Sequence, residues 1–204
     1  MISSLYFSTI KGIKMTIRRG QKSDSKAIAG FLMMAMEDIA YRFIGREDYQ
    51  EAFDFLKTLI EMEGNQYSYS NNWVLEEDGV LVGTALLYDG GELAKLREPV
   101  AALVAERYQL PFNPEHETEA GEIYIDCIAI DPSQQGKGIG SKLLSFLITE
   151  YVERNQQTLG LLVDLDNPKA KKLYARLGFE VIKAKTLLGK QLEQMQFKAN
   201  RSIS

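Results

Sequence analysis

The sequence is poor in the residues that build metal centres and disulfide frameworks. Its 204 residues include one cysteine, Cys127, and one histidine, His116. A single thiol excludes an internal disulfide framework and a cysteine-based zinc site. A single imidazole argues against a histidine-rich metal centre and against a Ser/His catalytic pair, so no metal is expected.

Long apolar runs are also missing. No stretch approaches the roughly 18 uninterrupted apolar residues that a membrane-spanning helix needs. The N-terminal segment lacks the continuous apolar core and the small-residue cleavage site of a secretory signal. Because cysteine is scarce as well, we expect a cytoplasmic protein with no membrane partner.

Neither sign of charge dominates the chain. Twenty-four basic and 28 acidic side chains leave a net charge of −4, which argues against a general binder of nucleic acids or anionic membranes. The C-terminal segment 183–204 is locally basic, but apolar residues interleave with its lysines. This pattern favours a closing β-hairpin with lysines facing water over a nucleic-acid-binding tail, so no nucleic acid partner is expected.

The remaining composition is that of one ordinary globular domain. Apolar residues make up 45% and charged residues 25% of the chain, and its length fits a single core. We expect residues 1–14 to form a short extension, residues 15–199 to form a single domain and residues 200–204 to fray.

The N-terminal half predicts two helices and an antiparallel hairpin. After a short strand at 16–19, Ser23 and Asp24 offer an N-cap to one long amphipathic helix that reaches residue 43, and a second helix covers 47–63. Asp78-Gly79 joins two β-rich arms, which is a strong hairpin signal.

The next segment, over residues 92–108, has a helical pattern but contains Pro99. Proline cannot donate its backbone hydrogen bond inside a helix. We therefore expect two short helices or a kink at this position.

The C-terminal half predicts alternating strands and helices. Strands are expected at 122–131, 159–164, 179–185 and 191–199, and helices at 138–154 and 168–177. Antiparallel strands followed by βαβα units indicate a mixed α/β fold, with a central sheet flanked by helices.

A glycine-rich turn follows the strand at 122–131. Gly136, Gly138 and Gly140 stand at the mouth of an amphipathic helix, with Lys137 and Lys142 beside them. Glycines allow close backbone approach, and the free N–H groups and dipole of a helix start favour a phosphate. The turn therefore predicts an anion site for a phosphate or pyrophosphate.

Two other glycine motifs compete for this turn. A P-loop is excluded because no Gly-Lys-Ser/Thr triplet is present. A dinucleotide fingerprint can be drawn on Gly136, Gly138 and Ser141, with Asp164 about 20 residues further on, as in an oxidoreductase. However, residues 131–135 separate its first glycine from the strand, and serine replaces the third glycine.

The turn resembles a known motif more closely. Gln135-x-x-Gly138-x-Gly140 is similar to the coenzyme A pyrophosphate motif of the GNAT superfamily of N-acetyltransferases. About 30 residues downstream a second signature of that superfamily follows, in matching order and spacing. Its matching residues are Asn167, Ala170, Leu173, Tyr174, Gly178 and Phe179.

The resemblance implies a GNAT-like mixed sheet of about six to seven strands, antiparallel in its N-terminal part. Its parallel pair would splay at the cofactor site, and acetyl-CoA would lie between strand segments 127–130 and 161–164. The enzyme would then transfer an acetyl group to a primary amine by direct attack in a ternary complex. Members of this superfamily are often dimers, so the resemblance also allows a homodimer.

The resemblance also implies roles for individual residues. Ile128, Ala129 and Ile130 would contact the pantetheine arm through the main chain, as an added strand does. Asn167 would hydrogen-bond the cofactor arm, and Tyr174 would protonate the departing thiolate. The pyrophosphate would be held by Gln135, Gly136, Lys137, Gly138, Ile139, Gly140 and Ser141.

A base must also take a proton from the amine. Glu122, Tyr124 and Asp126 share one face of their strand by alternation, and the odd-numbered residues 123–127 share the other face unless a bulge changes the phase. We favour Asp126 as the base and place Glu122 second. A solvated or paired carboxylate remains the alternative for both.

Two further residues and one segment bear on the acceptor. Cys127 has no obvious activator as a nucleophile, and we expect His116 to be solvated. The segment 92–122 holds seven acidic and three basic residues, a local charge of −4. We hypothesise that it attracts a cationic amine; the alternative is an ordinary solvated surface.

Two other functions remain open from the sequence. One is the dinucleotide-binding oxidoreductase. The other is a sensor or interaction module that binds coenzyme A without turnover.

Overall fold

The computed structural model describes residues 6–10, 13–187 and 189–199. Within these residues, eight strands form one mixed sheet in the order β1-β2-β3-β4-β5-β6-β8-β7. The strands are β1 (Tyr6–Ile10), β2 (Ile13–Arg19), β3 (Asn72–Glu77), β4 (Val80–Asp89), β5 (Glu122–Ile130), β6 (Thr158–Asp164), β7 (Glu180–Leu187) and β8 (Lys190–Phe197). The predicted mixed α/β class is confirmed. One more strand is present than expected, because β1 lies in the segment 1–14 and pairs with β2.

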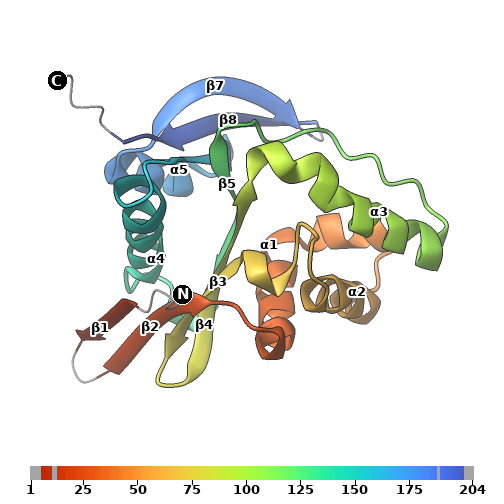
Figure 1. Cartoon of the computed structure of the whole chain (residues 1–204), viewed down its shortest axis with the longest axis horizontal. Coiled ribbons are helices and arrows are strands. Elements are labelled where there is room, and N and C mark those ends of the chain that lie inside the picture. Colours follow the sequence, from red (N-terminus) through yellow and green to blue (C-terminus); the bar gives the residue numbers. More distant parts are fainter. Residues whose placement is uncertain (1–5, 11–12, 188, 200–204) are drawn as a thin grey trace.

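Helices cover both faces of this sheet (Figure 1). They are α1 (Ser25–Ile44), α2 (Tyr49–Glu61), α3 (Leu93–Tyr108), α4 (Ile139–Leu147) and α5 (Pro168–Leu177). A π-helical segment, η5 (Ile148–Glu153), directly continues α4. No helix among the described residues is long and apolar enough to cross a membrane.

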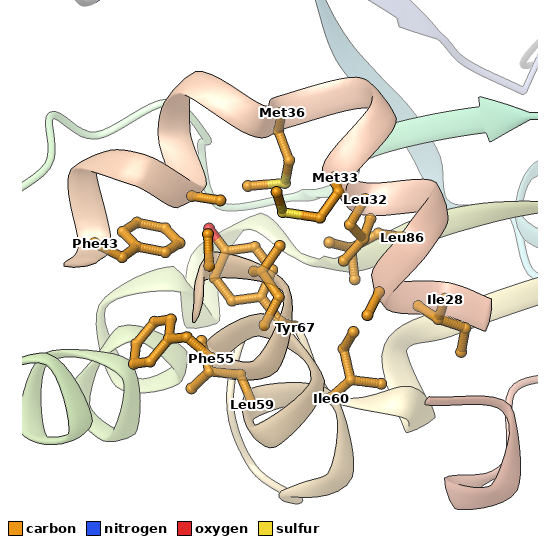
Figure 2. Close-up of a cluster of buried hydrophobic side chains, with 14 of the residues drawn as sticks. Ile28, Leu32, Met33, Met36, Phe43, Phe55, Leu59, Ile60, Tyr67 and Leu86 are labelled. Carbon is orange, nitrogen blue, oxygen red and sulfur yellow. The ribbon is translucent and has the colours of Figure 1, made fainter. Parts of the chain in front are cut away.

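Two hydrophobic cores lie on opposite faces of the sheet. The first joins α1, α2 and α3 to β4 and β5, and Figure 2 shows its centre, where side chains of α1 and α2 surround Tyr67. The second core joins α4, η5 and α5 to the sheet around Trp73 and Phe146, whose rings are 4.7 Å apart. The functional groups described below lie along β5, between these cores.

The start of α1 differs from the prediction. Asp24 makes no side-chain cap for this helix. Its carboxylate instead accepts hydrogen bonds from the Arg18 guanidinium, at 2.7 and 3.1 Å, and from the Gln21 N–H at 2.8 Å. Asp24 is the N-cap residue of α1, as predicted, but its side chain does not cap the helix because a cationic donor on β2 competes for the carboxylate.

The course of α1 also differs, because Met36 interrupts it. The backbone of Met36 has φ −143° and ψ 34°, outside the helical region. The expected single regular helix is therefore two helical segments that meet at a kink.

Two short helices or a kink were expected at Pro99, and the first of these alternatives is wrong. α3 runs from Leu93 to Tyr108 as one helix with Pro99 inside it. The proline removes one backbone donor. Val100 and Val104, which are fully or almost fully buried, pack this helix onto the first core and offset that loss.

The expected hairpin is confirmed. Asp78 and Gly79 join β3 to β4 with φ values of 48° and 84°. Two consecutive positive φ angles match a type I′ turn, the connection that fits the twist of paired strands.

A bulge in β5 decides where its side chains point. Ile125 pairs with Leu87 and Cys127 pairs with Leu86, so Asp126 is an extra residue in the ladder. Ile125 packs into the second core, whereas Cys127 packs into the first. Residues 123 and 125 share a face as expected, and Cys127 lies on the other face because a bulge changes the phase, which was the stated exception.

The parallel pair β5/β6 diverges at this bulge. Its register runs from Glu122↔Thr158 to Ile125↔Leu161 and goes no further. Beyond it, residues 127–130 of β5 pair only with β4 within the described chain. The predicted splayed parallel pair is confirmed.

Candidate active site

The glycine turn forms a backbone cradle at the start of α4. Gly136 and Gly138 have φ values of 78° and 76°, and a side chain at either would meet no atom within 4 Å. The backbone conformation, rather than crowding, therefore requires glycine here. The first bond of the helix runs from the Lys142 N–H to the Gly138 carbonyl, so the N–H groups of residues 139–141 precede it and point to the helix start.

This turn faces α5 across an open groove of about 710 Å³. Ten of the predicted cofactor-binding residues line the groove: Ile128, Ile130, Gln135, Gly136, Gly138, Ile139, Gly140, Ser141, Asn167 and Tyr174. The two others do not line it. Ala129 packs into the first core, and Lys137 is exposed with its Nζ donating to Gln134 Oε1 at 2.8 Å.

Sequence reasoning missed the basic rim of this groove. Lys169, Lys172 and Arg176 line it from α5, and the Arg176 guanidinium donates to Ser141 Oγ at 3.3 Å. Their spacing of three and four residues places them on one helix face, which is a signal that the sequence contains. The rim adds positive charge beside the N–H groups of the turn.

Asn167 is the N-cap residue of α5 and lines the groove. Its Oδ1 accepts the Ala170 N–H at 3.1 Å as a helix cap, and its amide nitrogen is a hydrogen-bond donor. One side chain thus shapes the helix start and offers a hydrogen bond to a ligand.

Tyr174 lies one turn before the end of α5. Its ring packs against Phe179, with centroids 6.0 Å apart. Burial raises the pKa of the Tyr174 phenol, and the nearby Cys127 thiol raises it further. The phenol is therefore protonated at neutral pH and can donate a proton.

Asp126 lies on the other side of β5, because of the bulge. Its Oδ2 accepts hydrogen bonds from Gln66 Nε2 at 2.9 Å and from the Tyr88 hydroxyl at 3.1 Å. Burial raises the pKa of the Asp126 carboxyl, and these two hydrogen bonds and Arg97 partly counter that rise.

Glu117 is a second carboxyl at this place, and the sequence did not single it out as a catalytic candidate. Arg97 Nη2 donates to its Oε1 at 2.7 Å, with both side chains largely buried. Burial and the negative charge of Asp126 raise the pKa of Glu117 to about 7, against the effect of Arg97. Its acidic loop was visible in the sequence, but its turn toward Asp126 was not.

The loop that contains Glu117 is fixed from both sides. Arg97 Nη1 donates to the carbonyl of Glu115 at 3.0 Å, and the Thr118 hydroxyl donates to the carbonyl of Gly90 at 2.6 Å. A side chain at Gly90 would overlap the Glu119 carbonyl, so the loop packs directly on this backbone.

Asp126 and Glu117 share a small cavity of about 50 Å³, which we call the carboxylate pocket. Gln66 and Arg97 complete its polar end. Apolar side chains of α1 and of the loop after α3 form most of the remaining wall, together with Tyr67, Glu115 and Leu187. The pocket lies on the face of β5 opposite the groove.

Glu122 shares a face with Asp126, as predicted, but its carboxylate is buried and occupied. Gln196 Nε2 donates to its Oε2 at 2.7 Å and Gln194 Nε2 does so at 3.2 Å, while the Glu119 N–H donates to Oε1 at 3.3 Å. Glu122 thus ties β5 to β8 and to the loop that contains Glu117.

The single histidine and the single cysteine are not among the candidate catalytic groups. His116 is exposed, as expected. Cys127 is buried, and burial together with the charge of Asp126 raises the pKa of its thiol. Within the described residues, no group of three or more His, Cys, Asp or Glu side chains could hold a metal ion.

A mixed sheet with one diverging parallel pair, a glycine cradle on one side and a carboxylate pair on the other is typical of an acyltransferase. The family model described as "Acetyltransferase (GNAT) family" matches residues 33–179, which is more than half of the chain. The chain belongs to the GNAT acetyltransferase family, and the resemblance seen in the sequence is confirmed. Its glycine turn is accordingly better explained as an acetyltransferase motif than as a dinucleotide loop.

Solved structures share the fold over most of the chain. A crystal structure of an acetyltransferase is 31% identical, with a TM-score of 0.77 over 90% of this chain and 99% of that one. An N-acetyltransferase from Staphylococcus aureus Mu50 is 22% identical, with a TM-score of 0.78 over 89% and 99%. YncA of Salmonella typhimurium, solved with acetyl-CoA, is 21% identical, with a TM-score of 0.55 over 93% and 96%.

The curated relatives match a shorter stretch. A mycothiol acetyltransferase of Mycobacterium sp. (strain JLS) is 39% identical over 70 residues, which are 32% of this chain and 23% of that protein. One from Gordonia bronchialis is 37% identical over 65 residues, 32% of this chain and 20% of that protein. The chain thus spans about a quarter or less of the length of these relatives.

Proposed function

We propose that the protein is an N-acetyltransferase that moves an acetyl group from acetyl-CoA to a primary amine by direct attack. One observation supports this most strongly. β5 and β6 part after Ile125 and Leu161, with the groove and Tyr174 on one side of β5 and the carboxylate pocket on the other. The Cys127 thiol interacts with both sides: it raises the pKa of the Tyr174 phenol, and Asp126 raises the pKa of the Cys127 thiol.

The groove fits acetyl-CoA in shape and charge. The N–H groups of residues 139–141 and the basic rim of α5 suit the pyrophosphate, and the free edge of β5 at Ile128 and Ile130 suits the amide-bearing pantetheine arm. Acetyl-CoA bound there would supply the acetyl group as a thioester, and coenzyme A would leave as a thiol.

The residues on either side of β5 would each move one proton. An alkylammonium has a pKa near 10, so a base must deprotonate it before its nitrogen can attack the carbonyl carbon. The nitrogen–carbon bond forms, the carbon–sulfur bond breaks, and the Tyr174 phenol gives its proton to the sulfur. The nitrogen loses its second proton as it becomes an amide, and this proton restores the Tyr174 phenol through solvent. A phenol held protonated by burial suits this donation.

We assign the base role to the pair Asp126 and Glu117. A general base works best when its pKa lies near the operating pH, and Glu117 meets this condition. Asp126 keeps its predicted place, either as the direct acceptor or through a water. Glu122 would be a positioning residue rather than the proton acceptor, because three donors already occupy its carboxylate.

The same pocket supports a cationic amine as acceptor. Two carboxylates face one guanidinium, and Arg97 is already engaged by Glu117, Gln66 and the carbonyls of residues 114 and 115. The pocket therefore retains negative charge for an ammonium group.

Two measurements on the purified chain test the proposal. In a thermal-shift comparison, acetyl-CoA and free CoA should raise the Tm while NAD and NADP should not; a ligand at 100 times its Kd adds about 2.7 kcal/mol. In a thiol-release assay, CoA should appear only when acetyl-CoA and an amine are both present. Stabilisation by a nicotinamide dinucleotide would favour the oxidoreductase, and stabilisation by CoA without turnover on any amine would favour the sensor.

A further inference from the structure

We propose that the amine acetylated by this protein bears a slender apolar chain and not a second cationic group. This inference rests on the proposed function and concerns the carboxylate pocket. The pocket is polar at one end and apolar at the other, and each end selects one part of the acceptor.

The polar end can take one ammonium group. Both hydrogen bonds of Asp126 within the described chain reach Oδ2, from Gln66 and Tyr88, so Oδ1 is the oxygen that an ammonium group would meet. Glu117 approaches from the loop with its Oε1 bound to Arg97. A single ammonium between these two carboxylates would satisfy both.

The apolar end is built from α1 and from the loop after α3. Phe43 makes an edge contact with Phe112, with centroids 5.5 Å apart, and packs against Tyr67 at 5.7 Å. Met36 and Ile39 complete this wall. Figure 2 shows Met36, at the kink of α1, and Phe43, near the end of this helix, directed toward Tyr67.

The kink at Met36 is part of this arrangement. A regular helix would not give Met36 a φ of −143°. Met33 and Phe43 on either side of it are buried in the first core. The irregular turn therefore places Met36 and Ile39 over the pocket.

The size of the pocket limits the chain. A water-sized group needs about 10–15 Å³ of cavity volume. The pocket of about 50 Å³ therefore admits roughly four such groups in a row, for example four methylene groups. An unbranched alkyl chain fits this space, whereas a saturated ring does not without movement of the wall.

A second ammonium on the chain would lie among the apolar side chains. Burying an unpaired charge is strongly unfavourable. Glu115 is the further carboxylate at this pocket, but it is exposed, and an ion pair with an exposed carboxylate is weak. A diamine should therefore be a poorer substrate than a monoamine of the same length.

The test compares three small amines under saturating acetyl-CoA. n-Butylamine and 1,3-diaminopropane have the same number of non-hydrogen atoms and differ by one terminal ammonium, while cyclohexylamine is bulkier. We expect kcat/KM for n-butylamine to exceed those for the other two at least tenfold. Equal values, or a preference for the diamine, would overturn the inference while leaving the acetyltransferase proposal in place. Absence of turnover with all amines would overturn both.

Variants at Phe112 test the two arguments separately, since this partly exposed loop residue is not among the proposed catalytic groups. Phe112→Glu should lower the preference for n-butylamine over 1,3-diaminopropane about tenfold, and Phe112→Ala should selectively raise kcat/KM for cyclohexylamine. Leu165→Ala, at an exposed position outside the pocket, is the control and should leave both ratios unchanged. Unchanged ratios in both Phe112 variants would show that this wall does not contact the acceptor.

Discussion

Glu117 and Asp126 reach the same pocket from different elements, and the negative charge of Asp126 helps to raise the pKa of Glu117 to about 7. One carboxyl comes from a loop and the other from a strand bulge. The Arg97 guanidinium fixes the first, while Gln66 and Tyr88 fix the second. The pair can therefore exchange a proton with an acceptor near neutral pH.

The first prediction concerns the pH dependence of the reaction. If Glu117 must be ionised to act as base, kcat/KM should rise about tenfold per pH unit below 7 and level off above it. Glu117→Gln should lower kcat/KM by roughly 10²-fold or more and abolish this rise with pH. Glu119→Gln, on the same loop but paired with Lys183 at the surface, should keep the wild-type profile. If Glu117→Gln kept the rise of kcat/KM with pH, another group would be responsible for this pH dependence.

Folding stability gives a second readout of the same group, free of catalysis. The pKa of Glu117 is raised from 4.5 to about 7 on folding, so between these values the folded state binds more protons than the unfolded state. Its contribution to the free energy of unfolding is thus present below about pH 4.5 and is lost as the pH rises through about 7. Urea unfolding at pH 5 and pH 8 should show Glu117→Gln gaining stability relative to wild type at the higher pH. A difference that does not vary with pH would contradict the raised pKa.

The third prediction concerns the proton donor. Tyr174→Phe removes the hydroxyl and keeps the ring that packs on Phe179. We expect kcat to fall roughly 10²-fold or more, with little change in the Kd of acetyl-CoA or in Tm. Tyr49→Phe, at an exposed position on α2, is the matched control. Unchanged kcat in Tyr174→Phe would mean that another group or water protonates the thiolate.

The groove could be predicted from the sequence because its signals are local. The glycines of the turn lie within five residues of one another, and Asn167 and Tyr174 belong to one short helix. Each signal reports a backbone requirement, a positive φ or a helix cap, that neighbouring residues satisfy without help from the rest of the chain.

The carboxylate pocket could not be predicted in the same way. Period-two alternation gives no sign of the extra residue at Asp126, which depends on the register of β4 against β5. Glu117 turns inward because of Arg97, which is 20 positions away on α3. Both features depend on contacts between elements, so the sequence indicated an acidic loop without its orientation.

The fourth prediction separates backbone strain from cofactor binding. Gly138→Ala and Gly64→Ala each place a side chain at a positive φ, 76° and 75°, in open space. Both should lower the free energy of unfolding by about 1–2 kcal/mol. Only Gly138→Ala should also lower the affinity for acetyl-CoA, because a distorted turn misdirects the N–H groups at the start of α4. Titration of both variants by calorimetry checks this, and equal affinity in the two would remove the turn from the binding site.

The last prediction concerns the close packing of Gly160 of β6 against Glu122. A side chain at Gly160 would overlap the Glu122 carboxylate, whose oxygens already accept from Gln194 and Gln196. Gly160→Ala should therefore lower the free energy of unfolding by about 1–3 kcal/mol, as overpacking does. Because Glu122 also binds the Glu119 N–H, the loop that holds Glu117 should loosen, and kcat should fall more than the KM for acetyl-CoA rises. Gly30→Ala, inside α1 with open space around it, should instead stabilise the protein slightly and leave kcat unchanged. If Gly160→Ala lost stability but kept full kcat, Glu122 would hold the sheet together without positioning the base.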